Sequence, residues 1–162
     1  MIEFLLVAKV VGGIGILLYF WEYLVHFFSK NVIPWIKKYW SVSAADLVAK
    51  LISFLDGKIV PTKALLKKAW TYFKTNILKM NTEYVKVDAN TAERKTTTWL
   101  KDSQGDAIKT IVEEKVSWSE LPQEIREQMI NEDTNEGMIN EKQQIINRMS
   151  ERCEEECIEI MV

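Results

Sequence analysis

A long apolar run dominates the start of the chain. Phe4–Phe28 holds only three side chains that can carry a charge near neutral pH, those of Lys9, Glu22 and His26. At a helical rise of about 1.5 Å per residue, its 25 residues extend for roughly 37 Å, and the hydrocarbon core of a bilayer is about 30 Å thick. The pattern therefore predicts a retained transmembrane helix within residues 1–29.

Two other interpretations of this run stay open. A cleaved signal peptide is disfavoured, because the flank Met1–Glu3 carries no Lys or Arg and no small-residue cleavage site follows. A helix buried in a protein core fits the twelve uninterrupted apolar residues Val10–Trp21. The membrane span is preferred because Lys9 and Glu22 lie near its ends, where long side chains reach the lipid head groups.

Small residues recur on one face of the predicted span. Ala8, Gly12 and Gly15 are spaced i, i+4 and i+7, a pattern that lets two membrane helices approach closely. We expect this face to mediate oligomerisation. In such an assembly, the polar side chains within the membrane, which are Lys9, Glu22 and His26, would turn towards the interior of a bundle or pore.

The next segment, residues 30–80, is basic and amphipathic. It contains ten lysines and two acids, for a net charge of +8, and it includes two predicted helices, Ala44–Asp56 and Thr62–Met80. The second helix has an apolar stripe at helical spacing, formed by Leu66, Trp70, Phe73, Ile77 and Met80. An ordinary pair of packed helices, a pair lying on an anionic lipid surface, and a nucleic-acid surface remain open. The absence of arginine before Arg94 disfavours nucleic acid.

Aromatic residues alternate with lysines directly after the span, as in segments that lie at a membrane surface. Lysines near the end of a span stay in the cytoplasm, so the N-terminus is expected outside and the C-terminus in the cytoplasm. The anionic inner leaflet is then the expected lipid partner. The expected membrane-interface residues are Trp35, Lys37, Lys38, Tyr39, Trp40, Lys67 and Lys74.

The remainder of the chain is acidic. Residues 81–162 carry ten basic and nineteen acidic side chains, for a net charge of −9. The pattern of residues 81–130 predicts a small α+β module. A linker at 131–137 and an acidic C-terminal helix at 138–162 are expected after it. The module contains β-prone runs at Glu83–Asp88, Lys95–Lys101 and Ile108–Val112, and a helix that starts after Ser119 and ends near Ile130. The predicted fold class is therefore an α+β membrane protein with one N-terminal span, a basic helical hairpin, a β-hairpin/α cytosolic module and a C-terminal helix.

Catalytic chemistry is not indicated. The single histidine, His26, lies in the apolar run, and the glycines there are not followed by the Lys-Ser/Thr of a phosphate-binding loop. Cys153 and Cys157 share one helix face, but a metal site needs further ligands, so they are interpreted as apolar-face cysteines. No catalytic residue, metal or cofactor is expected.

These observations favour a non-enzymatic, single-span membrane protein that self-associates and presents an acidic module for assembly or for an unidentified cytosolic protein partner. The alternative is an oligomeric pore-forming or membrane-disrupting effector that is gated by the same module. A sensor of an anionic ligand is a third class, and the net charge of −9 in residues 81–162 argues against it.

Overall fold

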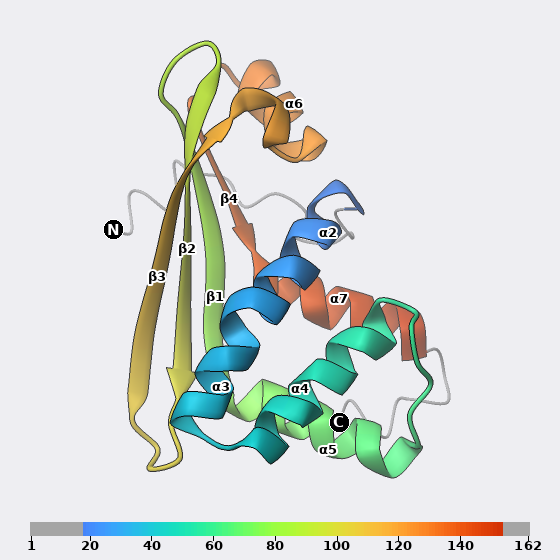
Figure 1. Ribbon diagram of the computed structural model, residues 1–162. Coiled ribbons are helices and arrows are strands. Elements are labelled where there is room, and N and C mark those ends of the chain that lie inside the picture. The colour runs from blue at the N-terminus through green and yellow to red at the C-terminus, as the bar shows by residue number, and fades with distance from the viewer. Residues whose placement is uncertain (1–17, 154–162) are drawn as a thin grey trace.

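The helical first half of the chain leads into an antiparallel sheet whose strands alternate buried and exposed residues (Figure 1). The computed structural model describes residues 18–153. The elements of the first half are α2 (Leu18–Phe27), a π-helical turn (Phe28–Val32), α3 (Ile33–Tyr39), α4 (Val42–Leu55) and α5 (Lys63–Asn76). Those of the second half are β1 (Ile77–Lys86), β2 (Thr91–Lys101), β3 (Ala107–Ser117), a 3₁₀ turn (Trp118–Glu120), α6 (Gln123–Asn131), β4 (Glu136–Asn140) and α7 (Glu141–Cys153).

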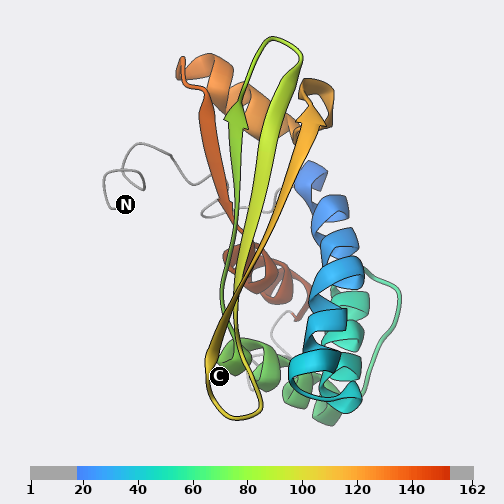
Figure 2. The same ribbon diagram turned by 60° about the vertical axis from the view of Figure 1, so that its left-hand side comes forward.

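The sheet has the strand order β3-β2-β1-β4, and all three pairings are antiparallel. Because successive side chains of a strand point to opposite faces, the register fixes which residues share a face. The inner face carries the buried residues Met80, Thr82 and Tyr84 of β1, and the helices pack against it. Figure 2 shows the opposite face, which none of the described helices covers. We call this the open face of the sheet.

Local sequence explains where the helices begin and end. The Ser41 hydroxyl accepts a hydrogen bond from the Ala44 amide at 3.1 Å and caps α4, and Thr62 caps α5 in the same way through Leu65 at 3.2 Å. Gly57 follows α4 with a φ of +77°, a conformation in which a side chain would be strained. The chain thereby turns back so that α5 packs along α4.

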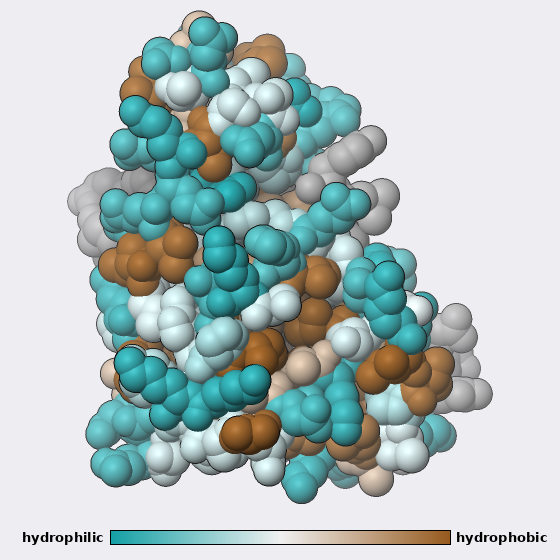
Figure 3. All heavy atoms as spheres, viewed as in Figure 1, coloured by the Kyte–Doolittle hydropathy of each residue, from teal (hydrophilic) through white to brown (hydrophobic). Residues whose placement is uncertain are grey.

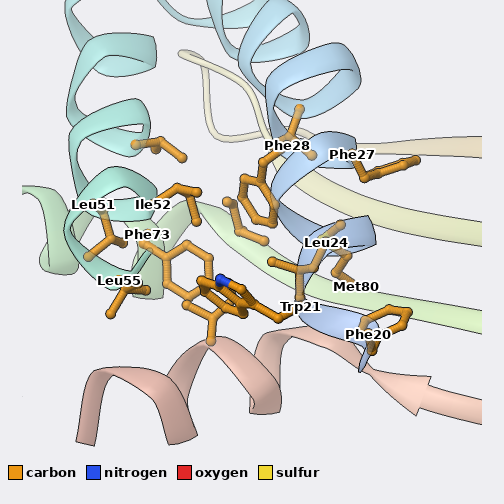
Figure 4. Packing of buried hydrophobic residues seen from close by; sticks show 14 of the residues in the cluster. Phe20, Trp21, Leu24, Phe27, Phe28, Leu51, Ile52, Leu55, Phe73 and Met80 are labelled. Carbon is orange, nitrogen blue, oxygen red and sulfur yellow. The ribbon is translucent and has the colours of Figure 1, made fainter. Parts of the chain in front are cut away.

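Aromatic and aliphatic side chains from α2, α4, α5 and β1 form one core (Figure 4). Leu24 of α2 is fully buried, and the Phe28 ring lies 6.5 Å from that of Phe73 on α5. Phe73 also stacks on Trp70 at 5.5 Å. Complete burial of one such side chain contributes about 1.5–3 kcal/mol, so this core is the main source of stability. The residues labelled in Figure 4 are Phe20, Trp21, Leu24, Phe27, Phe28, Leu51, Ile52, Leu55, Phe73 and Met80.

The predicted transmembrane helix is wrong for the part of the run that the structure describes. Within residues 18–153, no helix is long and apolar enough to cross a membrane. Leu18–Phe27 is a ten-residue helix, and Phe20, Leu24 and Phe27 are buried in the protein's own core. An apolar helix that lies in lipid and one that lies in a core have the same hydrophobic periodicity, which is why the sequence pattern misled.

The fold class and localisation that depended on the span are corrected accordingly. The described chain is a small α+β fold with a four-stranded antiparallel sheet, instead of a single-pass membrane protein with its N-terminus outside and its C-terminus in the cytoplasm. The membrane, single-pass and pore interpretations therefore lose their basis. On the face shown in Figure 3, hydrophobic residues form separate patches among hydrophilic ones.

The C-terminal helix α7 closes the helical layer. Arg148 donates from Nε to the Leu55 carbonyl oxygen at 3.0 Å, and its guanidinium lies 4.9 Å from the centre of the Trp21 ring. Trp21 in turn donates from Nε1 to Asp56 at 2.9 Å. One arginine of α7 thus contacts both α2 and the end of α4.

Candidate functional site

A chain of buried polar side chains runs beneath the centre of the sheet. The Tyr23 hydroxyl lies 2.6 Å from that of Thr96, which lies 2.9 Å from the hydroxyl of Thr82. Thr82 donates to Oε1 of Glu141 at 2.5 Å. Thr82, Thr96 and Glu141 are fully buried. These residues come from α2, β2, β1 and α7, so the contacts fix two helices on the sheet. We call the four residues the polar network.

The strand register accounts for the centre of this network. Thr82 and Thr96 are directly paired across β1 and β2, and both point to the inner face. Cross-strand threonine pairs of this kind hydrogen-bond through their hydroxyls. Glu141 is the first residue of α7 and follows Asn140, which pairs with Asn81 of β1. The last strand therefore delivers the carboxyl to the neighbourhood of Thr82.

Arg94 connects the polar network to the surface. It pairs across the sheet with Tyr84 on one side and Glu114 on the other. Its guanidinium lies 4.0 Å from the centre of the Tyr23 ring, and its Nη2 is 3.1 Å from Oε2 of Glu114. The side chain of Arg94 is 13% exposed and that of Glu114 is 42% exposed, so this ion pair extends from the interior to solvent.

Burial sets the protonation of the network. It raises the pKa of the Glu141 carboxyl to about 8, although the hydrogen bond from Thr82 and the charge of Arg94 act in the opposite direction. Burial also raises the pKa of Tyr23 to about 12, an effect that the nearby carboxyl of Glu141 strengthens. At neutral pH most Glu141 carboxyls are therefore protonated, and the network is predominantly uncharged.

The chemistry that this arrangement supports is structural. A substrate has no access to side chains that are fully buried, whereas a neutral hydrogen-bonded chain can fix α2 and α7 in one position. Among the described residues, the second oxygen of Glu141 is buried without a hydrogen-bond partner. Each such group opposes folding, so the network is sensitive to changes around it.

The open face above the network carries charges in cross-strand rows. Glu83, Lys95 and Glu113 form one row across β1, β2 and β3, and the neighbouring row contains Glu93 and Lys115. Together with Arg94 and Glu114 they line a hollow of about 370 Å³. Oppositely charged neighbours across strands stabilise the sheet modestly, and exposed charges of this kind also suit contact with a charged partner.

The residues predicted within the membrane fall into two groups. Ala8, Lys9, Gly12 and Gly15 lie outside the described residues. Glu22 and His26 are exposed on α2 and line a shallow hollow together with Asp56 and Lys58. Glu22 and His26 thus share a face of α2 that points away from the core.

The residues predicted at a membrane interface are held largely by the protein itself. The Trp35 ring packs against Phe27 at 5.9 Å. Trp40 donates from Nε1 to the Lys101 carbonyl oxygen at 2.6 Å and meets Tyr72 edge to face. The ammonium nitrogen of Lys38 lies 5.2 Å from the centre of the Tyr39 ring, and that of Lys74 lies 5.9 Å from the centre of the Trp70 ring. The side chains of Lys37, Lys38 and Lys67 are exposed.

Sequence reasoning missed Tyr23, Thr82, Arg94, Thr96 and Glu141 as a group. Their side chains meet only through the strand register and the packing of α2 and α7, and no local motif marks them. As for metals, residues 18–153 contain no group of three or more potential ligands that could hold an ion, and Cys157 lies outside that range.

No protein-family model, curated protein or solved structure matches this chain.

Proposed function

We propose that this chain is a non-enzymatic assembly module that self-associates head to tail. The observation that supports the proposal is the segregation of charge along the strands of the sheet. At one end, the open face carries Lys79, Lys101 and Lys109, and at the other end it carries Glu83, Glu93 and Glu113 with Lys95 and Lys115 among them. The antiparallel register aligns three strands so that one end of the open face carries lysines alone and the other carries more glutamates than lysines.

The helices extend the basic end. The amide of Ser103, in the β2–β3 turn, donates to the carbonyl oxygen of Tyr39 at 3.2 Å and holds the end of α3 beside that turn (Figure 1). The exposed lysines of α3 and α5 thus belong to the same end of the molecule as those of the sheet. The basic end comprises Lys37, Lys38, Lys67, Lys68, Lys79, Lys101 and Lys109.

The connections at the far end of the strands gather acidic residues. The amide of Trp118 donates to Asn90 at 2.8 Å, and that of Lys86 donates to Asn135 at 2.8 Å, so the β1–β2 turn, the 3₁₀ turn and the loop before β4 meet there. The helix α6 caps this end in Figure 1. The acidic end comprises Glu83, Glu93, Glu113, Glu114, Glu120, Glu132, Asp133 and Glu136.

Two ends of opposite charge on one molecule are complementary between copies. A contact of one patch with a different patch on the next copy repeats along a row, forming an open filament unless the rotation closes a ring. Because the charges are exposed, salt screens the attraction over a Debye length of about 8 Å at physiological ionic strength. A self-association of this kind is therefore salt-dependent.

Sedimentation velocity of the full chain tests the proposal. We expect species larger than a monomer at 50 mM NaCl that dissociate at 500 mM. Lys67→Glu with Lys68→Glu lowers the charge of the basic end by four, and Glu93→Lys with Glu113→Lys raises that of the acidic end by four, so each double variant should self-associate more weakly. Mixing the two variants should restore a complex, because the first keeps the unmodified acidic end and the second keeps the unmodified basic end.

A matched control changes the net charge equally elsewhere. Lys30→Glu with Lys58→Glu reverses two exposed lysines outside the basic end and should leave the salt-dependent association intact. A monomer at both salt concentrations, or association that is as strong in both end variants as in the unmodified chain, contradicts the proposal.

A further inference from the structure

A tryptophan lies between two lysines on the open face of the sheet. Trp99 of β2 pairs with Lys79 of β1 and with Lys109 of β3, so the three residues form one cross-strand row. The ammonium nitrogen of Lys109 is 5.4 Å from the centre of the Trp99 ring. Trp99 is half-buried, whereas both lysines are exposed. We call these residues the Trp99 row.

The neighbouring row on the same face is uncharged. Asn81, Thr97 and Ile111 are paired across the three strands, and Ile111 is 44% exposed. None of the outward-facing side chains in these two described rows is acidic. This half of the open face is thus an aromatic and apolar platform flanked by cations, in contrast to the alternating charges of the other half.

We infer that the Trp99 row binds single-stranded RNA. An aromatic ring on an open antiparallel sheet can stack with a nucleic-acid base, and lysines on either side can contact the phosphates. Bases in a duplex are already stacked, so only a single strand can use the ring. The inference goes beyond the proposed self-association, because it depends on the tryptophan and its neighbours instead of on the separation of charge.

Two features of the site indicate which nucleic acid it prefers. All charged groups of the site are lysines, which lack the paired donors that arginine uses to read base edges, so binding is independent of base sequence. Asn81 and Thr97 place an amide and a hydroxyl beside the Trp99 row. Such groups can hydrogen-bond the ribose 2′-hydroxyl, which favours RNA over DNA.

The lack of arginine in residues 30–80 weighs against recognition of bases by the basic helices. It does not weigh against binding at the Trp99 row, which lies on the sheet. The Trp99 row belongs to the sheet, and its members are 20 and 10 positions apart in the sequence. Only the strand register brings them together.

Fluorescence anisotropy of a labelled U20 RNA with the full chain tests the inference. We expect saturable binding at 50 mM NaCl that weakens with salt. Trp99→Ala should lower the affinity for U20 by about five-fold to one-hundred-fold, the range for loss of one stacked base, and Trp99→Phe should retain most of it. Lys79→Ala with Lys109→Ala should weaken binding and make the slope of log affinity against log salt shallower by about 1.4.

Three controls separate stacking from general attraction to polyanions. Lys115→Ala removes a lysine from the same face at its acidic end and should leave RNA affinity nearly unchanged. Heparin carries charge without bases, so its binding should not respond to Trp99→Ala. A T20 DNA should bind less tightly than U20, and equal affinity would overturn the choice of RNA.

The result is independent of self-association, because Trp99→Ala removes no charge and should leave the sedimentation behaviour unchanged. The inference is overturned by an absence of U20 binding at 50 mM NaCl. It is also overturned if a folded Trp99→Ala protein binds U20 as tightly as the unmodified chain. Circular dichroism establishes that the variant is folded before either outcome is read.

Discussion

The hydroxyl of Tyr23 lies 2.6 Å from the hydroxyl of Thr96, 73 residues further along the chain. The contact is a polar one on a helix whose residues Phe20, Leu24 and Phe27 are buried in the apolar core. Apolar packing tolerates small shifts of a helix, whereas a displaced α2 would separate the Tyr23 hydroxyl from its partner in the polar network. The polar network therefore specifies where α2 lies on the sheet more than it adds to overall stability.

Thr96→Val should destabilise the protein by about 1–3 kcal/mol, because it removes a hydroxyl that contacts both Tyr23 and Thr82. Tyr23→Phe should cost less, since it removes the hydroxyl at the end of the chain of contacts. The double variant should be more stable than the sum of the two effects predicts, and urea denaturation of all four proteins measures this coupling. Strict additivity would show that the two hydroxyls do not interact.

Glu141 should make stability depend on pH. The carboxyl has an ordinary pKa of 4.5, and in the folded protein burial raises the pKa to about 8, so the folded state holds the proton more tightly. The contribution of Glu141 to the free energy of unfolding is greatest below pH 4.5. It declines between pH 4.5 and 8, by at most about 1.4 kcal/mol per pH unit.

Glu141→Gln removes this titration, so the loss of stability with rising pH should become smaller. Urea denaturation midpoints at pH 5, 6.5 and 8 measure the change. Glu151→Gln, an exposed residue of the same helix, is the matched control and should keep the slope of the unmodified protein. An unchanged slope in Glu141→Gln would mean that other groups cause the pH dependence.

Leu24→Ala tests the burial of α2 in the core. Leu24 is fully buried, so its truncation should cost about 2–5 kcal/mol in the free energy of unfolding. Glu22→Ala, two residues earlier and exposed, should change stability by no more than about 0.5 kcal/mol. Equal effects in guanidinium denaturation would contradict the packing of α2 described above.

Arg148→Ala should weaken the attachment of α7. The change removes a hydrogen bond to Leu55 and the cation–π contact with Trp21, with an expected cost of about 1–3 kcal/mol. Glu151→Ala removes only the 4.0 Å ion pair with Arg148. Because the Glu151 side chain is exposed, this ion pair should contribute little to stability. Hydrogen exchange of the α7 amides should accelerate in Arg148→Ala and remain unchanged in Glu151→Ala.

The elements with strong local signals could be predicted from the sequence. The β-branched run before the Asp102–Asp106 turn predicted a hairpin, and β2 pairs with β3 there with Gly105 at a φ of +87°. In the stripe of the predicted helix Thr62–Met80, Leu66, Trp70 and Phe73 are buried on α5. The prediction is wrong at its end, because α5 stops at Asn76 and Ile77 and Met80 are buried on β1. The strand β4 was not predicted, because Glu136–Asn140 is short and polar at both ends, and its pairing with β1 depends on tertiary structure.

The polar network and the Trp99 row could not be predicted, because both depend on register. A shift of one residue between strands would turn Trp99 or Thr96 to the opposite face. The register is set by the pairing of whole strands, with an irregularity at Leu78 between Ile77 and Lys79. Hydrophobic periodicity carries no information about such an irregularity.

The position of α2 has a consequence for synthesis of the chain. Its apolar face emerges from the ribosome well before Thr96, and at 5–20 residues per second the 73-residue interval takes roughly 4 to 15 seconds. Throughout that interval, Phe20, Leu24 and Phe27 have no completed sheet to pack against, so the apolar face of α2 lacks part of its final core. Folding of the newly made chain is therefore expected to compete with binding of α2 by targeting factors or chaperones until the sheet is complete.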